Sequence, residues 1–386
     1  MNKTDSTYEE RQEWRQRCIL SNDSFMMGLP KIELHVHIEG TMSADLRWRL
    51  SVRNGISLTA GSDKTPLSSL EEVREAYKHI RGRIGAAAAD AKTNMTFYEA
   101  YYGGFDLLQT EGDYYDLAMG YFERASQMQV RYCEPFFDPQ GHTRRGIPSD
   151  VMMRGFKRAQ DEAESRLKAR TMIKSQWIMC ILRDLSPESA MAQYEAMLLY
   201  KSMVVGIGLD SDEFQQPPSL FQAVFKRARA DGFKLTTHCD FNQKNTHEHI
   251  LQVAKSLGGN GAERIDHGMN AADHPELMQI IREKGIGMTI CPCAYIRHTS
   301  EYEVFPRIRK LFDAGIQVTI ASDDSAYMED NWIFHNLYLV REKCEFTNGD
   351  LISLQRNAVS ICWTDRETKI AILDELATFE KNGYSS

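Results

Sequence analysis

Short apolar runs of strand length recur along the chain and alternate with amphipathic segments of helix length. Several of the amphipathic segments begin with Ser, Thr or Pro, which are favoured at helix N-termini. Near-continuous apolar strands joined by helices predict a parallel sheet that is covered on both faces. The apolar runs are eight in number and lie at residues 31–38, 130–137, 173–182, 203–209, 233–238, 263–267, 286–291 and 316–321.

Eight such units in one stretch of about 300 residues predict an α/β fold of the closed (β/α)8 type, the TIM barrel. An open, doubly wound sheet is the alternative. The usual nucleotide-binding signals of that open sheet are missing, because no G-x-G-x-x-G follows the first strand and the chain has no Walker loop. We therefore expect the closed barrel.

The segments outside the strand pattern predict additions to the barrel. Residues 1–29 form a charged N-terminal extension, in which Ser6 and Glu9 have the spacing of a capping box at the start of a short helix. Residues 57–95 have a looser pattern with several glycines and an alanine run, so we expect an inserted excursion that is helical in part and is a candidate lid. No repeat or linker divides the remainder, and we treat 30–386 as a single domain.

Helices are predicted at four further places beside the barrel pattern. The first follows the first strand, near residues 43–54, with Ser43 as its N-cap. Two more are expected at 97–110 and 112–128, and a helical end at 331–382.

The composition and net charge of the chain limit the classes of molecule that we expect it to bind. The chain has 386 residues, of which 42% are hydrophobic, and a formal net charge of −8 at pH 7. This charge argues against nonspecific binding to nucleic acid or to an anionic membrane. No apolar run approaches the roughly 18 residues that span a bilayer, the polar N-terminus has no signal-peptide core, and eight cysteines are too few for a disulfide scaffold. We expect a cytoplasmic protein with reduced cysteines and a small-molecule substrate, and we leave its oligomeric state open.

Polar residues of the metal-ligand type follow several predicted strands at their C-terminal ends, where barrel enzymes place their chemistry. In the first strand His35 and His37 are two residues apart and project to the same face. His238 ends the fifth strand, His267 ends the sixth, and Asp323 follows the eighth almost directly. A buried aspartate is rare unless it is paired or bound to a metal. This set therefore predicts a metal site.

Imidazole and carboxylate groups are ligands that zinc accepts. Three histidines and one carboxylate still leave room for a water molecule, and zinc lowers the pKa of its bound water to ~7. His267 would then act as a base or orient the resulting hydroxide. Asp324, at the position next to Asp323, could hold the substrate.

A second histidine pair, His247 and His249, lies on a predicted helix. Positions i and i+2 of a helix diverge by about 200°, so these two side chains do not form a ligand pair. We interpret them as part of a solvated helix face.

At the strand ends the chain resembles the adenosine/adenine deaminase family of metal-dependent aminohydrolases. The matching segments occur in the order of the family and span about residues 30–330. They are PKIELHVHIEG (30–40), VVGIGLDSDE (204–213), the strand end at His238, RIDHG (264–268), TICP (289–292) and VTIASDDSAY (318–327). The segment EPFFDPQGHTRRG (134–146) and the form GIGLDS look more like the adenine-acting branch.

The resemblance implies a (β/α)8 barrel that holds one zinc ion, with His35, His37, His238 and Asp323 as its ligands. His267 matches the histidine beside the activated water. Asp324 matches the carboxylate that contacts the imidazole nitrogen of the purine, and Glu39 and Ser211 match positions that line the substrate pocket.

One departure from the family lies directly after the fifth strand. The family continues this histidine as His-Ala-Gly-Glu, and the glutamate protonates a purine ring nitrogen. Here the run is His238-Cys239-Asp240-Phe241, so Phe241 stands where the family has its acid. Asp240 is one residue earlier and one methylene shorter, and it is the candidate replacement. The alternative is a loop carboxylate that bonds nearby backbone N–H groups.

These observations together predict a zinc-dependent enzyme that hydrolytically deaminates a 6-aminopurine, such as adenine, adenosine or an N6-substituted relative, with release of ammonia. Because the family's usual acid is replaced, the second hypothesis is a metal-dependent deaminase that acts on a different amino-heterocycle. A catalytically inactive, metal-dependent binding protein is the third. The sequence favours an enzyme, because the residues that would generate the nucleophile are complete.

Overall fold

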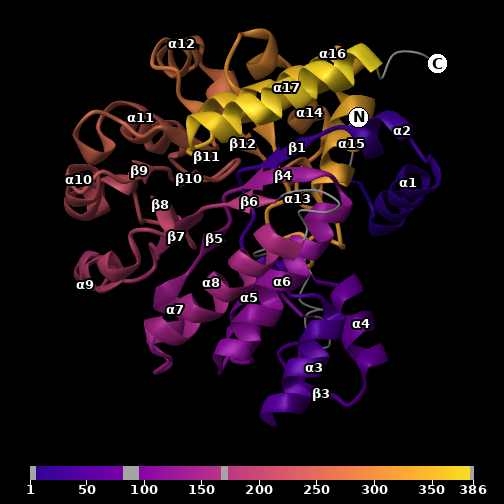
Figure 1. Cartoon of the computed structure of the whole chain (residues 1–386), viewed down its shortest axis with the longest axis vertical. Helices are drawn as coiled ribbons and strands as arrows, with labels where there is room; N and C mark the ends of the chain where they lie inside the picture. The colour runs from indigo at the N-terminus through magenta and orange to yellow at the C-terminus, as the bar shows by residue number, and fades with distance from the viewer. Residues whose placement is uncertain (1–5, 81–94, 167–172, 383–386) are drawn as a thin grey trace.

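Parallel strands lie in the middle of the molecule with helices around them (Figure 1), and their pairings join them into a closed ring. The computed structural model describes residues 6–80, 95–166 and 173–382. Every pairing within the ring is parallel, as expected for strands that helices connect. The (β/α)8 barrel predicted from the hydrophobic pattern is thus confirmed.

The eight barrel strands follow one another in sequence order around the ring, and three of them consist of two short pieces each. They are β1 (Lys31–Glu33), β4 and β5 (Val130–Cys133, Phe136–Phe137), β6 and β7 (Lys174–Ser175, Trp177–Leu182), β8 (Val204–Asp210), β9 and β10 (Lys234–Leu235, His238–Cys239), β11 (Arg264–His267), β12 (Gly287–Ile290) and β13 (Val318–Ile320).

The barrel closes between its first and last strands beyond the end of β13. Val36 forms an isolated parallel bridge with Asp323. The N–H of His37 donates to the carbonyl oxygen of Asp323 at 3.1 Å, and the N–H of Asp323 donates to the carbonyl oxygen of His35 at 3.0 Å. Backbone groups of three predicted metal ligands therefore complete the ring.

The observed strands are shorter than the predicted apolar runs. The run at 130–137 is divided at Pro135, which has no N–H to donate to a neighbouring strand. The run at 31–38 forms a regular strand only over Lys31–Glu33, with single bridges at Val36 and His37 further along. The hydrophobic pattern therefore locates the buried segments correctly, but it does not show where the hydrogen bonding between neighbouring strands is interrupted.

The predicted helices are present with small shifts at their ends. The helix after the first strand is α3 (Ala44–Asn54), and the side chain of its N-cap, Ser43, accepts from the N–H of Leu46 at 3.2 Å. The predicted helices at 97–110 and 112–128 correspond to α5 (Phe97–Phe105) and α6 (Glu111–Gln127). The helical end comprises α15 (Ile333–Lys343), α16 (Asn348–Ile361) and α17 (Arg366–Asn382).

The helices between the barrel strands lie around the ring or at its C-terminal end (Figure 1). Their bounds are α7 (Pro139–Thr143), α8 (Ser149–Arg166), α9 (Pro187–Met197), α10 (Gln222–Ala230), α11 (Thr246–Lys255), α12 (Pro275–Glu283), α13 (Pro292–Tyr295) and α14 (Glu301–Asp313).

The inserted excursion contains strands as well as a helix. An antiparallel hairpin, β2 (Leu58–Ala60) and β3 (Thr65–Leu67), precedes α4 (Leu70–Lys78). The alanine run from Gly85 to Ala89, which suggested a lid, lies outside the described residues.

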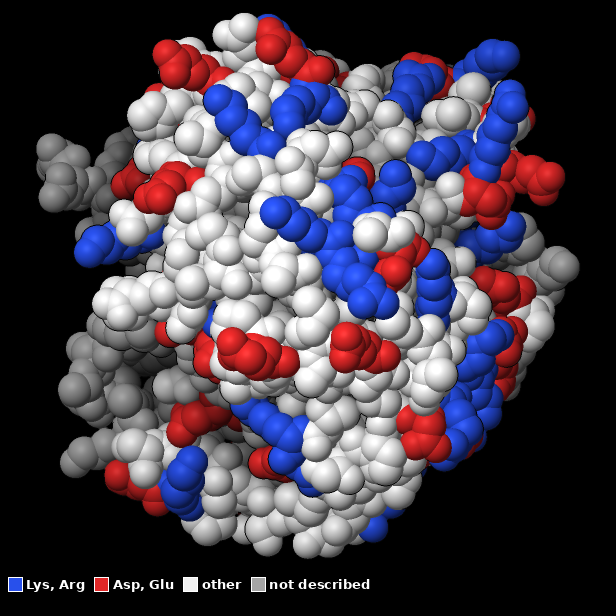
Figure 2. Space-filling model, turned by 90° about the vertical axis from the view of Figure 1, so that its left-hand side faces the viewer, with Lys and Arg blue, Asp and Glu red and all other residues white. Residues whose placement is uncertain are grey.

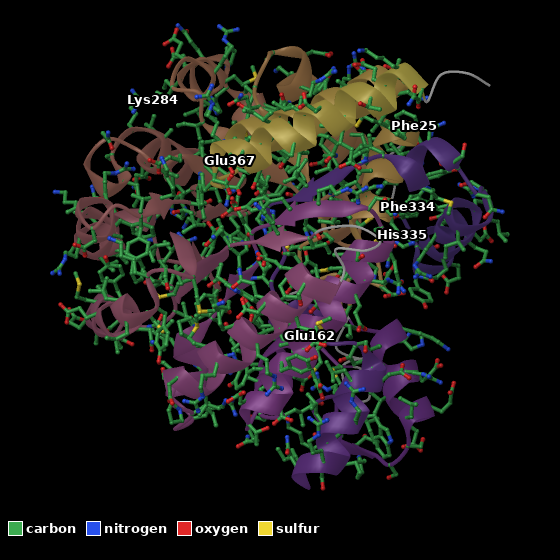
Figure 3. The ribbon with its side chains drawn as sticks, viewed as in Figure 1. Phe25, Glu162, Lys284, Phe334, His335 and Glu367 are labelled. Atoms are coloured by element: carbon green, nitrogen blue, oxygen red, sulfur yellow. The ribbon has the colours of Figure 1, made fainter. Side chains whose placement is uncertain are left out.

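The N-terminal extension packs against α15. It contains α1 (Tyr8–Leu20) and α2 (Ser24–Gly28), and Figure 3 shows Phe25 of α2 on the same side of the molecule as Phe334 and His335 of α15. The rings of Trp14 and Tyr338 lie 6.1 Å apart.

The predicted capping box at Ser6 and Glu9 was wrong by one residue. The N-cap of α1 is Thr7, which forms the reciprocal pair with Glu10. The hydroxyl of Ser6 instead donates to the carbonyl oxygen of Ile296 at 3.1 Å. This contact with a distant residue leaves the hydroxyl of Thr7 to cap the helix.

Charged side chains of both signs are interspersed on the face formed by α9, α10, α11 and α12 (Figure 2). Some pair along one helix turn, such as Arg227 and Asp231 at 2.8 Å. Among the described residues, no helix has both the length and the apolar character needed to cross a membrane.

Candidate active site

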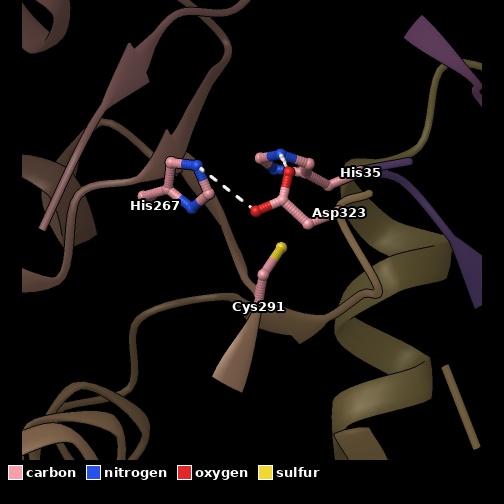
Figure 4. A group of neighbouring side chains, drawn as sticks. All are labelled: His35, His267, Cys291 and Asp323. Atoms are coloured by element: carbon pink, nitrogen blue, oxygen red, sulfur yellow. Dashed lines mark ion pairs between the residues drawn. The ribbon is translucent and has the colours of Figure 1, made fainter. Parts of the chain in front are cut away.

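The polar residues predicted to converge do so at the C-terminal ends of the barrel strands. His35, His37, His238, His267 and Asp323 are all buried. The ligand atoms of the first three lie within 4.8 Å of one another, and those of His35, His267 and Asp323 also lie within 4.8 Å of one another. Figure 4 shows the Asp323 carboxylate with one oxygen toward His35 and the other toward His267.

The Nε2 atoms of the imidazoles face a common centre. His37 Nε2 lies 3.1 Å from His238 Nε2. Asp323 Oδ1 lies 3.4 Å from His35 Nε2 and 3.6 Å from His37 Nε2. Burial raises the pKa of Asp323, but the adjacent His35 and the other neighbouring imidazoles outweigh this and hold the pKa well below its usual range.

The backbone is strained where two of these side chains leave their strands. His267 has φ = 63° and Asp323 has φ = 61°, and Ser211, at the end of β8, has φ = 72°. Residues other than glycine rarely adopt this left-handed region, at a cost of about 1–3 kcal/mol each, and such residues cluster at functional sites.

Neighbouring groups determine which ring nitrogen carries the proton in two of the histidines. His238 Nδ1 lies 3.1 Å from the carbonyl oxygen of Leu209, which can only accept, so Nδ1 carries the hydrogen. Thr289 donates its hydroxyl hydrogen to Asp266 at 2.8 Å and therefore accepts from His35 Nδ1 at 2.9 Å. Both histidines consequently turn an Nε2 lone pair toward the centre.

This arrangement fits a zinc ion. His35 Nε2 is buried and makes no hydrogen bond within the described residues. The two nitrogens of His37 and His238, 3.1 Å apart, would repel each other if both presented lone pairs without a cation between them. Two nitrogen ligands on a tetrahedral zinc, at the usual bond length of about 2.0–2.1 Å, lie about 3.3 Å apart. Burial and the adjacent imidazoles lower the pKa of His238 far below its usual value, which keeps this ligand neutral.

A group of buried carboxyl groups lies beside the Nδ1 atom of His37. Asp210 Oδ2 is 3.5 Å from His37 Nδ1, and Asp138 is close enough to join both in one cluster. Burial, with the adjacent charge of Glu39, raises the pKa of Asp138 to about 7, and burial beside Asp138 raises the pKa of Asp210 well above its usual value. Carboxyls this close share protons at neutral pH rather than ionise together.

His267 lies between the candidate metal ligands and Asp240. Its Nε2 is 3.5 Å from Asp240 Oδ1 and 4.0 Å from Asp323 Oδ2. Its Nδ1 is 2.7 Å from the hydroxyl of Tyr295, which also accepts from the N–H of Cys291 at 3.1 Å. Burial and the nearby His35 lower the pKa of His267, so the imidazole is neutral near pH 7.

The three predicted substrate-contacting residues lie at the same end of the barrel, in different surroundings. Asp324 packs against Gly40, where an added Cβ would lie 2.0 Å from Asp324 Oδ1. The hydroxyl of Ser211 is 2.7 Å from that of Tyr102 on α5.

Glu39 is buried and already bonded on one oxygen. Its Oε1 accepts from the N–H of Asp138 at 3.1 Å and from His142 Nε2 at 3.0 Å. Its Oε2 makes no hydrogen bond within the described residues, and burial raises the pKa of Glu39 to about 7.

Sequence reasoning missed a cysteine beside the candidate metal ligands. Cys291, to which sequence reasoning gave no role, has its sulfur within 4.8 Å of the ligand atoms of His35, His267 and Asp323 (Figure 4). Its place at the end of β12 was the available signal, because the other strand ends carry the chemistry. Burial, with the adjacent charge of Asp323, raises the pKa of this thiol, so it is protonated at neutral pH.

The interpretation of His249 as part of a solvated face was wrong. His249 is buried, and its Nδ1 lies 3.1 Å from Glu213 Oε2. His247 does turn away from it, as the helix geometry requires, and lies near Asp273. Glu213 falls in the segment 204–213 that resembles the family, but sequence reasoning gave it no role.

Known proteins share both the sequence and the fold. The family model described as adenosine deaminase matches residues 30–379. A protein of Schizosaccharomyces pombe named uncharacterized deaminase is 40% identical over 92% of this chain and 97% of its own length. The adenine deaminase of Acinetobacter baylyi is 33% identical over 92% of this chain and 99% of its own length.

Two solved structures are similar over nearly their whole length. The adenine deaminase of Arthrobacter aurescens has a TM-score of 0.78 and 28% identity, with 92% of this chain and 99% of that chain covered. An amidohydrolase of Burkholderia ambifaria, solved with bound zinc, has a TM-score of 0.77 and 24% identity, with 100% and 97% covered. This last likeness concerns the fold.

The family model matches most of the chain, and a protein named adenine deaminase is similar over nearly its whole length. Both findings agree with the buried cluster of histidines and aspartate at the strand ends. The chain is an adenine deaminase-like, metal-dependent aminohydrolase, and it belongs to the adenosine deaminase family.

Proposed function

We propose that this protein deaminates a 6-aminopurine hydrolytically, with adenine as the first candidate, and that it uses one zinc ion bound by His35, His37, His238 and Asp323. The convergence of the imidazole Nε2 atoms and the Asp323 carboxylate on one buried centre carries the proposal. The relatives named adenine deaminase support this substrate class. In the reaction, water adds to the amino-bearing ring carbon, the C–N bond breaks, and ammonia leaves.

A zinc ion held by these four residues would supply hydroxide at neutral pH, because it lowers the pKa of water to about 7. The protein groups around it would move the protons. His267 is suited to accept a proton at Nε2, since burial keeps its imidazole neutral and Tyr295 fixes the ring through Nδ1. Asp323 remains ionised and balances the positive charge.

We propose Asp240 as the acid that protonates the ring nitrogen of the substrate. Its Oδ1 lies 3.5 Å from His267 Nε2, so the carboxyl is at the reacting end of the barrel. The side chain is 15% exposed, which leaves it more accessible than the ligands around it. Phe241, in the position of the family's glutamate, is buried and packs against Tyr295 with ring centroids 5.8 Å apart.

Asp324, Glu39 and Ser211 are proposed to contact the substrate. Asp324 is next to a metal ligand, and Gly40 leaves the space its carboxylate occupies. Glu39 has a buried oxygen available for a donor on the substrate. Ser211 projects from a strained position at the end of β8, where its hydroxyl meets Tyr102.

The test is to incubate zinc-loaded protein with adenine, adenosine and N6-substituted adenines and to measure released ammonia or amine. We expect turnover of at least one of these purines and its loss in His238→Ala. Turnover only of aminopterins or aminopyrimidines would favour the second hypothesis, a different amino-heterocycle, which the exchange of the family's glutamate for Phe241 motivates. Tight binding of a purine without turnover of any compound would identify an inactive binding protein.

A further inference from the structure

Four buried side chains from two loops and one helix hold the backbone around Asp240, directly or through one another. Arg183 follows β7, Glu213 follows β8, and His249 and Thr246 belong to α11. All four are buried. They meet at the segment His238-Cys239-Asp240, where the chain departs from the His-Ala-Gly-Glu pattern.

Both backbone polar groups of Asp240 bind side chains of this group. Its N–H donates to Glu213 Oε1 at 2.6 Å, and its carbonyl oxygen accepts from the hydroxyl of Thr246 at 3.1 Å. Two residues earlier, the carbonyl oxygen of His238 accepts from Arg183 Nη1 at 2.9 Å. The backbone on either side of Cys239 is therefore anchored independently of the sheet.

Glu213 is itself fixed from two directions. Arg183 Nη1 lies 3.5 Å from its Oε1, and His249 Nδ1 lies 3.1 Å from its Oε2. Arg183 has no solvent exposure and also donates to the carbonyl oxygen of Gln216 through Nε and Nη2, at 3.0 and 2.8 Å. A buried carboxylate with three partners of this kind has little freedom to move.

The anchored backbone compensates for the short side chain of Asp240. Asp240 is one methylene shorter than a glutamate and begins one residue earlier, so its side chain has less reach with which to place the carboxyl. The backbone must place it instead, and a displacement of about 1 Å at a reacting group costs about a hundredfold in rate.

We propose that Glu213, held by Arg183 and His249, is a positioning residue that fixes Asp240 beside His267. This inference rests on the proposed function, in which Asp240 serves as the acid. Glu213 touches no reacting atom and acts only through the Asp240 N–H.

The first test is a double-mutant cycle on the zinc-loaded enzyme. Glu213→Ala is expected to lower kcat about ten- to hundredfold, with KM and zinc content unchanged, because it removes the acceptor of the Asp240 N–H. Glu213→Gln keeps an oxygen acceptor and should recover most of kcat. In an Asp240→Asn background, Glu213→Ala should change kcat by less than about twofold. An equal loss in both backgrounds would overturn the proposal.

A matched control is Glu134→Gln, which alters another buried carboxylate paired with an arginine, Arg264, with neither residue at the Asp240 loop. This variant is expected to lower stability without the coupling to Asp240. Loss of zinc from Glu213→Ala would also overturn the proposal, because the network would then support the ligand His238 rather than Asp240.

Hydrogen–deuterium exchange provides a readout that needs no substrate. In Glu213→Ala we expect faster exchange in peptides covering 238–242, with peptides of β11 unchanged. Unchanged exchange at 238–242 would contradict the proposal. If the wild-type protein turned over no substrate, the proposed function would fail, while this measurement would still decide whether Glu213 anchors Asp240.

Discussion

The N–H of His37 donates to the carbonyl oxygen of Asp323 at 3.1 Å, and the same two residues bring His37 Nε2 within 3.6 Å of Asp323 Oδ1. The same two residues therefore close the barrel through their backbones and contribute their side chains to the candidate metal site. A cation that binds these side chains also binds the first strand to the last.

Metal binding should therefore stabilise the fold. Removing zinc with a chelator is expected to lower the melting temperature, because a ligand present at a thousand times its Kd stabilises the native state by about 4 kcal/mol. Calorimetry of the zinc-loaded and chelated protein would measure the difference. In His238→Ala the two melting temperatures should coincide, and a difference of wild-type size there would refute the assignment of this ligand.

A methyl group at Gly40 should impair substrate binding. In Gly40→Ala the new Cβ would lie 2.0 Å from Asp324 Oδ1, so the carboxylate must move. We expect KM to rise about tenfold or more, with zinc content retained, since the loss of a hydrogen bond to a charged group costs about 1.5–3 kcal/mol. Steady-state kinetics would show this.

Gly120→Ala is the matched control for that variant. Gly120 lies in α6, and no heavy atom of the described residues is within 4 Å of an added Cβ. Alanine there should leave KM unchanged and stabilise the helix by about 0.5–1 kcal/mol. Equal KM values for the two variants would contradict the role of Asp324.

The hydroxyl of Tyr295 should matter for catalysis through His267. Tyr295→Phe leaves His267 Nδ1 and the N–H of Cys291 without their partner, at a cost of about 1–3 kcal/mol. We expect kcat to fall about 5- to 100-fold with zinc content unchanged. Tyr194→Phe removes a hydroxyl that contacts Asp231 on the outside of the barrel and should keep wild-type kcat. Equal activity of both variants would show that His267 does not depend on Tyr295.

Lys31 should impose a pH dependence on stability. It is fully buried, its Nζ donates to the carbonyl oxygens of Met26 and Leu29 at 2.7 and 2.9 Å, and burial lowers its pKa to about 7. The unfolded lysine has a pKa of about 10.4. Between these values the unfolded chain binds more protons than the native state, so the free energy of unfolding gains a component that rises with pH.

Denaturant unfolding of the wild type and of Lys31→Met, at pH values from 7 to 10, measures this component. The stability of the wild type should increase relative to the variant across that window. Parallel pH profiles would show that Lys31 keeps an ordinary pKa in the native state.

The barrel and most of the candidate site could be predicted because both follow from local patterns. Parallel strands carry their C-terminal residues to one end of a barrel, so His238, His267 and Asp323 needed only their strand positions to be placed together. Ser43 was predictable as an N-cap because its hydroxyl acts on a residue three positions along the chain.

The features that sequence reasoning missed depend on partners far apart in the chain. His249 is buried because Glu213, 36 residues away, accepts from it. Cys291 was given no role, because its sulfur meets the ligand cluster only after the barrel has closed. The choice of Thr7 over Ser6 as N-cap likewise follows from a contact with Ile296.

We propose that one zinc ion binds between His35, His37, His238 and Asp323. An anomalous difference map from a crystal of the zinc-loaded protein, recorded at the zinc absorption edge, tests this most directly. We predict one strong peak per chain, within bonding distance of the three Nε2 atoms and an oxygen of Asp323. A map without a peak there, or with the strong peak at another cluster, would contradict the account.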